Sequence, residues 1–180
     1  LHINTDESSI AGALRKLMGM EIMQGIDAYD CSTCNRRTKA ERSTKLHAIP
    51  PVLIIQVKRF AIDQVGQKMQ KDEARVAFDQ TLHLRSYVPG QTKQAAAVAE
   101  GADGGAPEAE LFAVVVHEGS QLEKGHYYTY TKGSTRSTRK EGEREDASDA
   151  AEERWYKLND ETVTEVTFEK VKNDQAYLLF

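Results

Sequence analysis

Apolar positions near the start of the chain recur with the period of an α-helix. They are spaced at i, i+4, i+7 and i+8, at Ile10, Leu14, Leu17 and Met18. This spacing places them on one face of a helix. Three polar residues that can cap the first free N–H groups precede this face, namely Thr5, Asp6 and Ser8. A second, short helix is expected near 168–172.

Later apolar runs predict strands, because they are short and rich in β-branched and aromatic residues. They lie at 52–57, 111–117, 126–130, 155–158 and 176–180. The run 52–57 is almost continuously apolar, which is typical of a strand covered on both faces. The order of these elements predicts an α+β fold that is mainly antiparallel β with few helices.

Two segments between the expected strands contrast with these runs. Residues 91–109 are rich in Ala, Gly and Gln and contain no aromatic residue. Residues 131–154 contain 13 charged residues among 24 and no large apolar side chain. Neither segment can bury enough apolar surface to offset the entropy lost on ordering. We therefore predict that both are flexible surface insertions.

Composition narrows the classes of function. The chain has 180 residues, with 28 Asp and Glu against 24 Lys and Arg, so its charge balance favours neither nucleic acid nor an anionic membrane as partner. No apolar run approaches the roughly 20 residues of a membrane span, and no signal-peptide pattern is visible at the start. Both cysteines fall in one CxxC, which is no disulfide framework. These features predict an intracellular protein, cytoplasmic, nuclear or both.

The CxxC formed by Cys31 and Cys34 allows three interpretations. Two thiolates at this spacing can bind one tetrahedral zinc ion, but they supply two of its four ligands. His2 and His47 are further candidate ligands, although neither stands at a zinc-knuckle spacing. A turn without metal is the second interpretation. Redox chemistry is the third and is disfavoured, because no amphipathic helix follows the pair.

Two histidines lie close together in the sequence, at the end of one expected strand and the start of the next. A hairpin would bring His117 and His126 to one rim of a sheet. If the strand 155–158 lies beside 126–130, then Asn159 or Asp160 comes within reach of an imidazole. A polar group that holds one ring nitrogen leaves the other for a nucleophile, which gives the base and orienter of a catalytic triad. The alternative is that both histidines only pack and hydrogen-bond within the sheet.

Several spaced blocks, which together cover nearly the whole chain, resemble ubiquitin-specific proteases. One set, at 29–34 and 45–60, is similar to that family's passage from fingers to palm. The other set, at 113–119, 125–130, 155–163 and 176–180, is similar to its histidine box and keeps the family's order. The resemblance implies a papain-like cysteine peptidase fold. It also implies fingers over about 1–50 and a palm over about 51–180.

The resemblance also implies roles for individual residues. His126 matches the general base, Asn159 the third triad position, and Asp160 an acidic neighbour that can share its task. The channel for the C-terminal tail of ubiquitin is matched by Gln56, Phe60, His117 and Tyr127. Loops that close over this tail are matched by 61–71 and 119–125. The partners implied are ubiquitin and ubiquitinated proteins, and no cofactor is implied for catalysis.

One part of the family pattern is missing from these residues. The nucleophile of the family lies in a thumb segment, in a box of the Gly-x-x-Asn-x-x-Asn-Thr-Cys-Tyr type, and no such stretch occurs here. The first CxxC of the fingers is also missing, so a structural zinc would need two ligands from outside this chain. The sequence is therefore expected to be the C-terminal part of a deubiquitinase catalytic domain, inactive without the thumb. The alternative is a ubiquitin-binding or scaffold relative that lacks the nucleophile.

Overall fold

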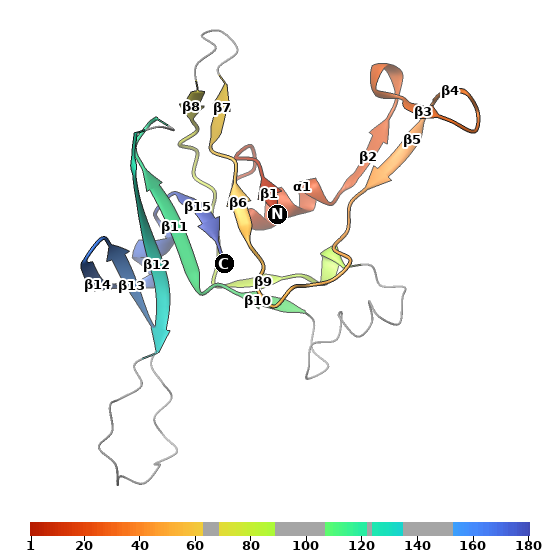
Figure 1. Cartoon of the computed structure of the whole chain (residues 1–180). Coiled ribbons are helices and arrows are strands. Elements are labelled where there is room, and N and C mark those ends of the chain that lie inside the picture. Colours follow the sequence, from red (N-terminus) through yellow and green to blue (C-terminus); the bar gives the residue numbers. More distant parts are fainter. Residues whose placement is uncertain (63–68, 89–106, 122–123, 135–152) are drawn as a thin grey trace.

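The computed structural model describes residues 1–62, 69–88, 107–121, 124–134 and 153–180 (Figure 1). Most of the two predicted insertions, 91–109 and 131–154, lies outside these ranges, as do parts of the loops 61–71 and 119–125. At their described ends the structure has strands where insertions were expected. The strand β10 (Glu108–Glu110) overlaps the first insertion, and β12 (His126–Ser134) and β13 (Glu153–Asn159) extend into the second.

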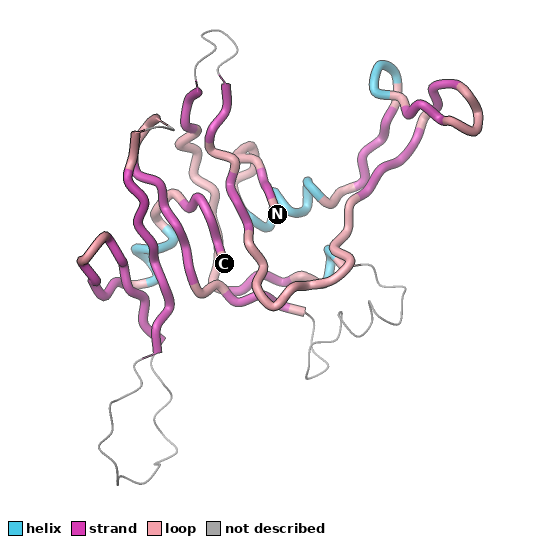
Figure 2. The backbone as a smooth tube through the Cα atoms, viewed as in Figure 1, coloured by secondary structure: helices cyan, strands magenta, loops and turns pink. Residues whose placement is uncertain are grey.

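A seven-stranded sheet dominates the described residues, as the strand trace in Figure 2 shows. Its order is β1 (His2–Ile3), β6 (Ile55–Val57), β15 (Ala176–Leu179), β11 (Ala113–Glu118), β12, β13 and β14 (Thr162–Val166). All neighbours in this sheet are antiparallel except β1 and β6, which are parallel. The mainly antiparallel prediction is confirmed.

Smaller two-stranded ribbons extend from this sheet. The strand β2 (Met20–Met23) pairs with β5 (Ala40–Ser43), and beyond them β3 (Tyr29–Cys31) pairs with β4 (Arg36–Thr38), so that together they form an arm that projects from the body (Figure 1). The other ribbons join β7 (Phe60–Ile62) to β8 (Met69–Lys71) and β9 (Thr81–His83) to β10. Short 3₁₀ turns occur at η1 (Gly25–Asp27) and η2 (Arg85–Tyr87).

The first helix, α1 (Ile10–Leu17), begins later than the cap candidates predicted. Its N-cap is Ser9, whose hydroxyl accepts a hydrogen bond from the Gly12 N–H at 3.1 Å, so the expectation of Thr5, Asp6 or Ser8 was wrong. Each of these three polar residues could cap a helix in isolation, and tertiary packing selected the residue next to the first buried position. The short helix α3 (Phe168–Lys172) is confirmed at the expected residues. None of the described helices has the length and apolar character that crossing a membrane requires.

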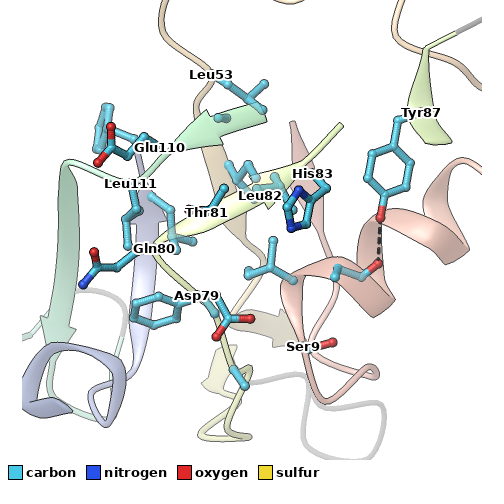
Figure 3. A pocket seen from close by; sticks show the side chains of 18 of the residues that line it. Ser9, Leu53, Asp79, Gln80, Thr81, Leu82, His83, Tyr87, Glu110 and Leu111 are labelled. Carbon is cyan, nitrogen blue, oxygen red and sulfur yellow. Dashed lines mark hydrogen bonds between the residues drawn. The ribbon is translucent and has the colours of Figure 1, made fainter. Parts of the chain in front are cut away.

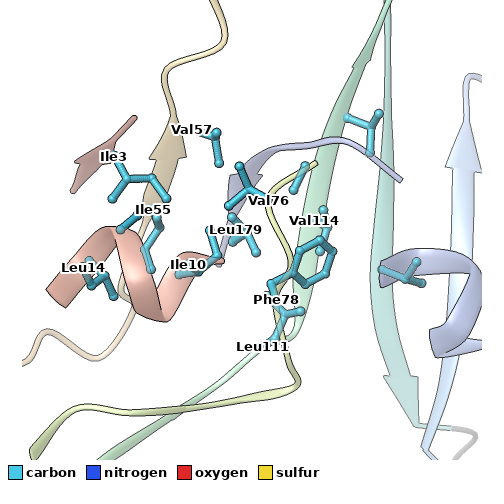
Figure 4. Close-up of a cluster of buried hydrophobic side chains, with 14 of the residues drawn as sticks. Ile3, Ile10, Leu14, Ile55, Val57, Val76, Phe78, Leu111, Val114 and Leu179 are labelled. Atoms are coloured by element: carbon cyan, nitrogen blue, oxygen red, sulfur yellow. The ribbon is translucent and has the colours of Figure 1, made fainter. Parts of the chain in front are cut away.

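The hydrophobic core lies between α1 and one face of the main sheet (Figure 4). From the helix, Ile10, Leu14 and Met18 are buried, but Leu17 is 42 % exposed, so one of the four expected core positions was wrong. The sheet contributes Ile55, Val57, Val114 and Leu179, and the segment before β9 contributes Val76 and Phe78. The helical period therefore identifies the buried face correctly and overestimates its width by one residue.

The strand β6 is shorter and less covered than its sequence predicts. Ile55 and Val57 are buried in the core, whereas Val52 and Ile54 are 48 % and 45 % exposed. Val52 and Ile54 precede β6 in a segment that forms no strand, and within β6 the residue between the two buried ones, Gln56, is only partly buried. The prediction of a strand covered on both faces was wrong.

A buried arginine follows β6 and joins three segments of the chain. Arg59 is 1 % exposed, and its Nε donates to the Ala176 carbonyl at 2.7 Å. Its Nη1 donates to the carbonyls of Asp72 at 3.2 Å and Ala74 at 2.8 Å. These bonds offset part of the cost of burying the charge, although the Arg59 Nη2 is buried with no hydrogen-bond partner among the described residues. Arg59 thereby fixes the start of β15 and the strand β6 relative to each other.

Replacement of Leu14 by Ala tests the core face of α1. Leu14 is fully buried, so the change leaves a cavity, and we expect the free energy of unfolding to fall by about 2–5 kcal/mol. Urea unfolding followed by the fluorescence of Trp155, the single tryptophan of the chain and a core residue, measures the loss. Leu17→Ala is the matched control on the same helix, with an expected loss of about 0.5 kcal/mol. Equal losses would contradict the assigned face.

Candidate active site

The antiparallel register of β12 and β13 brings His126 and Asn159 together. Thr129 is paired with Leu158, and continuing this register places Asn159 opposite Tyr128. His126 lies two residues before Tyr128 on the same face, which makes it the diagonal neighbour of Asn159. The His126 Nε2 lies 2.5 Å from the Asn159 Oδ1. The structure therefore places these two expected site residues in direct hydrogen-bond contact.

The imidazole of His126 remains accessible in this arrangement. Its side chain is 41 % exposed, and its second nitrogen, Nδ1, makes no hydrogen bond to any described residue. When Nε2 carries the ring proton and donates a hydrogen bond to the Asn159 amide oxygen, Nδ1 carries no proton and can accept one. The pair thus leaves Nδ1 as an acceptor without a described partner on a partly exposed ring.

Asp160 lies next to this pair but is placed differently. It begins the two-residue turn between β13 and β14, where it adopts a positive φ of 51°, a backbone conformation that Asp tolerates better than most residues. Its Oδ2 is 3.8 Å from the His126 Nε2, and its side chain is 78 % exposed. Asn159 is therefore the hydrogen-bond partner of His126 in this geometry, and Asp160 is a longer-range, solvent-screened neighbour.

The four residues expected to line a peptide channel also lie close together. The His117 ring is 5.3 Å from Phe60 and 4.7 Å from Tyr127, measured between centroids. Gln56 joins them through Tyr177, because its Nε2 donates to the Tyr177 hydroxyl at 2.9 Å. We call Phe60, His117, Tyr127 and Tyr177 the aromatic cluster.

Tyr177 was not among the candidate residues drawn from the sequence. Its ring lies 6.1 Å from Phe60 and 6.0 Å from Tyr127, so it closes a cycle of four rings in which each ring contacts two others. The sequence shows only that Tyr177 lies in the last strand. Its place in the site depends on the pairing of Gln56 with Leu178 between β6 and β15, which no local pattern predicts.

His117 is more enclosed than a residue at a strand end is expected to be. It is 2 % exposed, and a Cβ at Gly125 would collide with its ring and lie 2.6 Å from the Glu118 carbonyl oxygen. The Lys71 Nζ donates to the His117 carbonyl at 2.6 Å. Desolvation, together with the charge of Lys71, lowers the pKa of His117. A neutral His117 is thus a rigid wall of the aromatic cluster.

A buried polar network supports the strand that carries His126. The Tyr128 hydroxyl donates to the Asp174 Oδ2 at 3.0 Å, and the Tyr130 hydroxyl donates to the same oxygen. Burial opposes the charge of Asp174, but the hydrogen bonds from Tyr130 and Tyr128 prevail and hold its pKa below the usual range. Burial raises the pKa of both tyrosines. The Lys157 Nζ lies 3.7 Å above the Tyr128 ring.

The two cysteines lie in the turn region of the β3–β4 ribbon, far along the arm from β12 (Figure 1). The Cys34 N–H donates to the Cys31 Sγ at 3.4 Å, and N–H donation from Cys34 and Thr33 lowers the pKa of Cys31. Nowhere in the described ranges do three His, Cys, Asp or Glu side chains form a group that suits a metal ion. Neither His2 nor His47 therefore completes a site with these thiols.

A cavity of about 520 Å³ lies apart from this site, among α1, β6, β9, β10 and β15 (Figure 3). Its walls are mainly apolar, and the Tyr87 hydroxyl at its side donates to the Ala11 carbonyl at 3.1 Å. Neither His126, Asn159 nor any member of the aromatic cluster lines it. The cavity is therefore separate from the candidate active site.

Comparison with known protein families identifies the chain. The family model described as ubiquitin carboxyl-terminal hydrolase matches residues 7–180. The chain belongs to the ubiquitin carboxyl-terminal hydrolase family. This confirms the resemblance drawn from the sequence blocks.

Two curated relatives show how much of such a hydrolase this chain represents. Ubiquitin carboxyl-terminal hydrolase 25 of Arabidopsis thaliana is 30 % identical over 173 residues, which are 96 % of this chain and 22 % of that protein. The human ubiquitin carboxyl-terminal hydrolase 17-like protein 13 is 31 % identical over 172 residues, 96 % of this chain and 26 % of that protein. The chain thus spans about a quarter of the length of these hydrolases.

Solved structures support the same fold. The SAGA Ubp8/Sgf11/Sus1/Sgf73 DUB module bound to ubiquitin aldehyde matches 99 % of this chain and 34 % of that chain, with a TM-score of 0.72 and 24 % identity. A variant of that DUB module bound to monoubiquitin matches 99 % of this chain and 33 % of that chain, with a TM-score of 0.71 and 23 % identity. The mainly β fold with few helices is therefore that of a portion of a ubiquitin carboxyl-terminal hydrolase domain.

The burial of His117 predicts a pH dependence of stability. In the unfolded chain the His117 imidazole takes up a proton below pH about 6.5. In the folded chain its lowered pKa keeps it neutral to a lower pH. The unfolded state binds more protons between these two pKa values, so stability falls as the pH drops through this window.

We expect His117→Gln to flatten this decline, measured as the difference in unfolding free energy between about pH 7.5 and about pH 5.5. The slope is the readout, because loss of a buried ring destabilises the protein at every pH. His47→Gln, at an exposed histidine, is the control and should keep the slope of the wild type. A wild-type slope in His117→Gln would contradict a neutral, buried His117.

Proposed function

We propose that the protein containing this chain is a thiol-dependent deubiquitinase. It hydrolyses the isopeptide or peptide bond that follows the C-terminal glycine of ubiquitin, and this chain supplies the base and the orienter of a Cys-His-Asn triad. The observation that carries the proposal is the 2.5 Å contact between the His126 Nε2 and the Asn159 Oδ1, combined with an accessible ring. Family membership supports the same class of reaction.

In this mechanism His126 moves one proton in each half of the reaction. Its Nδ1 accepts the proton of a cysteine thiol from the thumb segment, and the thiolate attacks the carbonyl carbon of the last glycine. The imidazolium then returns the proton to the leaving amine as the C–N bond breaks, which leaves a thioester. Water, deprotonated by the same nitrogen, hydrolyses the thioester and regenerates the thiol. Asn159 holds the ring throughout by its hydrogen bond to Nε2.

The aromatic cluster is proposed as the binding site of the extended tail. The last two residues of the tail are glycines without side chains, so they fit a channel walled by aromatic rings. The main-chain groups of the tail then make its polar contacts. Phe60 and Tyr127 are the accessible walls, and the buried His117 is the rigid one. The side chain of Gln56 adds an amide group beside these rings.

The same proposal gives Cys31 and Cys34 a structural role. With the Cys31 thiol already acidified by N–H donors, the pair suits two positions of a tetrahedral zinc site. The other two ligands would come from outside this chain. The arm around β3 and β4 would then depend on zinc for its stability, and catalysis would not use the metal.

Removal of the base tests the proposed reaction. In the whole protein we expect His126→Ala to lower kcat/KM on a fluorogenic ubiquitin substrate by at least about 10²–10⁴-fold, because proton transfer loses its carrier. The affinity for ubiquitin should remain close to that of the wild type, since the ring lies beside the tail and not on it. Unchanged hydrolysis in this variant would refute the assignment of the base.

Comparison of two neighbouring substitutions tests the orienter. We expect Asn159→Ala to lower kcat/KM by about 10–100-fold, the value of one hydrogen bond to a charged group. Asp160→Ala should lower it by no more than about 5-fold, because Asp160 is exposed and 3.8 Å from Nε2. The reverse order of losses would make Asp160 the orienter. Two silent variants would remove both residues from the triad.

A wild-type protein that binds ubiquitin but hydrolyses no ubiquitin substrate would favour the scaffold alternative. In that outcome the His126–Asn159 pair would have no catalytic role. Hydrolysis lost on His126→Ala excludes this alternative, because a scaffold has no reaction to lose.

A further inference from the structure

The strand β9 has one paired edge and one open edge. The Leu111 N–H donates to the Gln80 carbonyl at 2.7 Å, so the even-numbered residues of this strand are those bonded to β10. In an antiparallel pair the intervening residues point their N–H and C=O groups away from the partner strand. The main-chain groups of Thr81 and His83 therefore face outward, and no described strand pairs with them.

The open edge of β9 continues an edge that is already paired nearby. Ala77 accepts a hydrogen bond from the Ile10 N–H at 2.9 Å, and its own N–H donates to the Ser8 carbonyl at 2.8 Å. Exposure alternates from residue to residue along 76–84, so the chain stays extended from there into β9. Groups on one edge recur at every second residue, so the edge that pairs at Ala77 is the one left open along β9. Pairing stops because the other segment enters α1.

The cavity of about 520 Å³ lies between this open edge and α1 (Figure 3). Residues 77–83 line it without interruption, and Ser9, Ala11 and Arg15 line it from the helix side. Successive strand residues point to opposite faces, so this unbroken run indicates that the edge of the strand borders the cavity. The Tyr87 hydroxyl closes the far end by its hydrogen bond to the Ala11 carbonyl.

The floor of the cavity suits one large apolar side chain. Ile10, Ile55, Leu111 and Leu179 line it and are buried. Its volume falls within the range of about 300–1,000 Å³ that is typical of ligand sites. A strand added to the open edge of β9 would place alternate side chains on this floor, while its main chain bonds to the edge.

Two charged side chains at the ends of the open edge have no partner among the described residues. Asp79 lies just before β9, and Arg15 lies one helical turn after Ala11, at the end that Tyr87 closes. A peptide with an acidic residue near Arg15 and a basic residue near Asp79 complements both charges. In the antiparallel direction, which is the more stable one, the acidic residue comes first.

We propose that the open edge of β9 and this cavity form a docking site for an extended peptide segment of a partner protein. The segment adds as a strand antiparallel to β9 and inserts a large apolar side chain into the cavity. An acidic residue precedes this side chain and a basic residue follows it. The site goes beyond the proposed function and does not depend on it.

A synthetic peptide tests this site in the whole protein. The probe is the fluorescein-labelled peptide Glu-Thr-Val-Leu-Val-Thr-Lys with an amidated end, together with versions that carry Phe or Trp in place of the central Leu. Fluorescence polarisation should give a Kd below about 1 mM for at least one of the three. Ala at the central position should weaken binding by about 10–100-fold, because the apolar side chain is lost from the cavity.

Methylated versions of the best probe test the strand pairing itself. With the central residue opposite Leu82, the N–H groups of the two valines face Thr81 and His83. Methylation of both valine nitrogens should weaken binding by at least about 5-fold, because two main-chain hydrogen bonds are lost. Methylation of the central nitrogen, whose N–H points away from β9, is the matched control and should leave the affinity unchanged.

Replacement of Thr81 by Pro removes one N–H from the open edge of the protein. Proline is tolerated on an edge strand where the N–H faces outward, and its ring blocks the approach of another strand. We expect Thr81→Pro to lose peptide binding and to keep its affinity for ubiquitin, which reports an intact fold. Thr81→Val keeps the N–H and should bind the peptide as the wild type does. The methylated peptides make the same comparison on the unaltered protein.

Three results would overturn the proposal. Absence of binding by all three probes would mean that another segment of the whole protein, or a second copy of it, occupies the edge. Equal affinities for the two kinds of methylated peptide would exclude strand pairing. Displacement of the probe by ubiquitin would place it at the candidate active site. Neither His126 nor Asn159 lines the cavity, so each of these results leaves the proposed function unaffected.

Discussion

The pairing of β12 with β13 is the constraint on which the candidate site depends. Main-chain hydrogen bonds fix this register, and the register alone sets Asn159 diagonally across from His126. A slip of one residue would turn one of the two side chains to the other face of the sheet. The chemistry therefore depends on a ladder of strand bonds as much as on the two side chains that it aligns. The hydrogen bond from the Tyr128 hydroxyl to Asp174 also holds the strand β12 in place.

Buried charges hold the surrounding segments in place. Arg59 donates to three main-chain carbonyls, those of Ala176 in β15 and of Asp72 and Ala74 after β8, and Lys71 donates to one, that of His117 in β11. Loss of one such cation would leave carbonyls without donors in an apolar region, which costs more than the bond itself contributes. The accessible imidazole of His126 thus lies in a fold whose neighbouring segments are held by hydrogen bonds from two buried cations.

The sequence predicted the elements with strong patterns and failed where tertiary contacts decide. The strands β11, β12, β13 and β15 were predicted from apolar runs, and the short helix α3 was expected at the residues where it lies. The cap of α1 was missed because Ser9 is one of several equivalent polar residues. His126 and Asn159 were predicted to meet because His126 begins one strand and Asn159 follows its expected neighbour, whereas Tyr177 was missed because its place requires the non-local pairing of β15 with β6.

The candidate site and the connection between the two strands lie at opposite ends of the β12–β13 hairpin. Their pairing runs from Thr129 and Leu158, close to the imidazole, to Ser134 and Glu153, where the intervening connection begins and ends. Six successive residue pairs therefore insulate the site from whatever joins the strands. We expect changes in the length of that connection to leave the pairing at the other end in place. A reporter domain or an affinity handle is best inserted there.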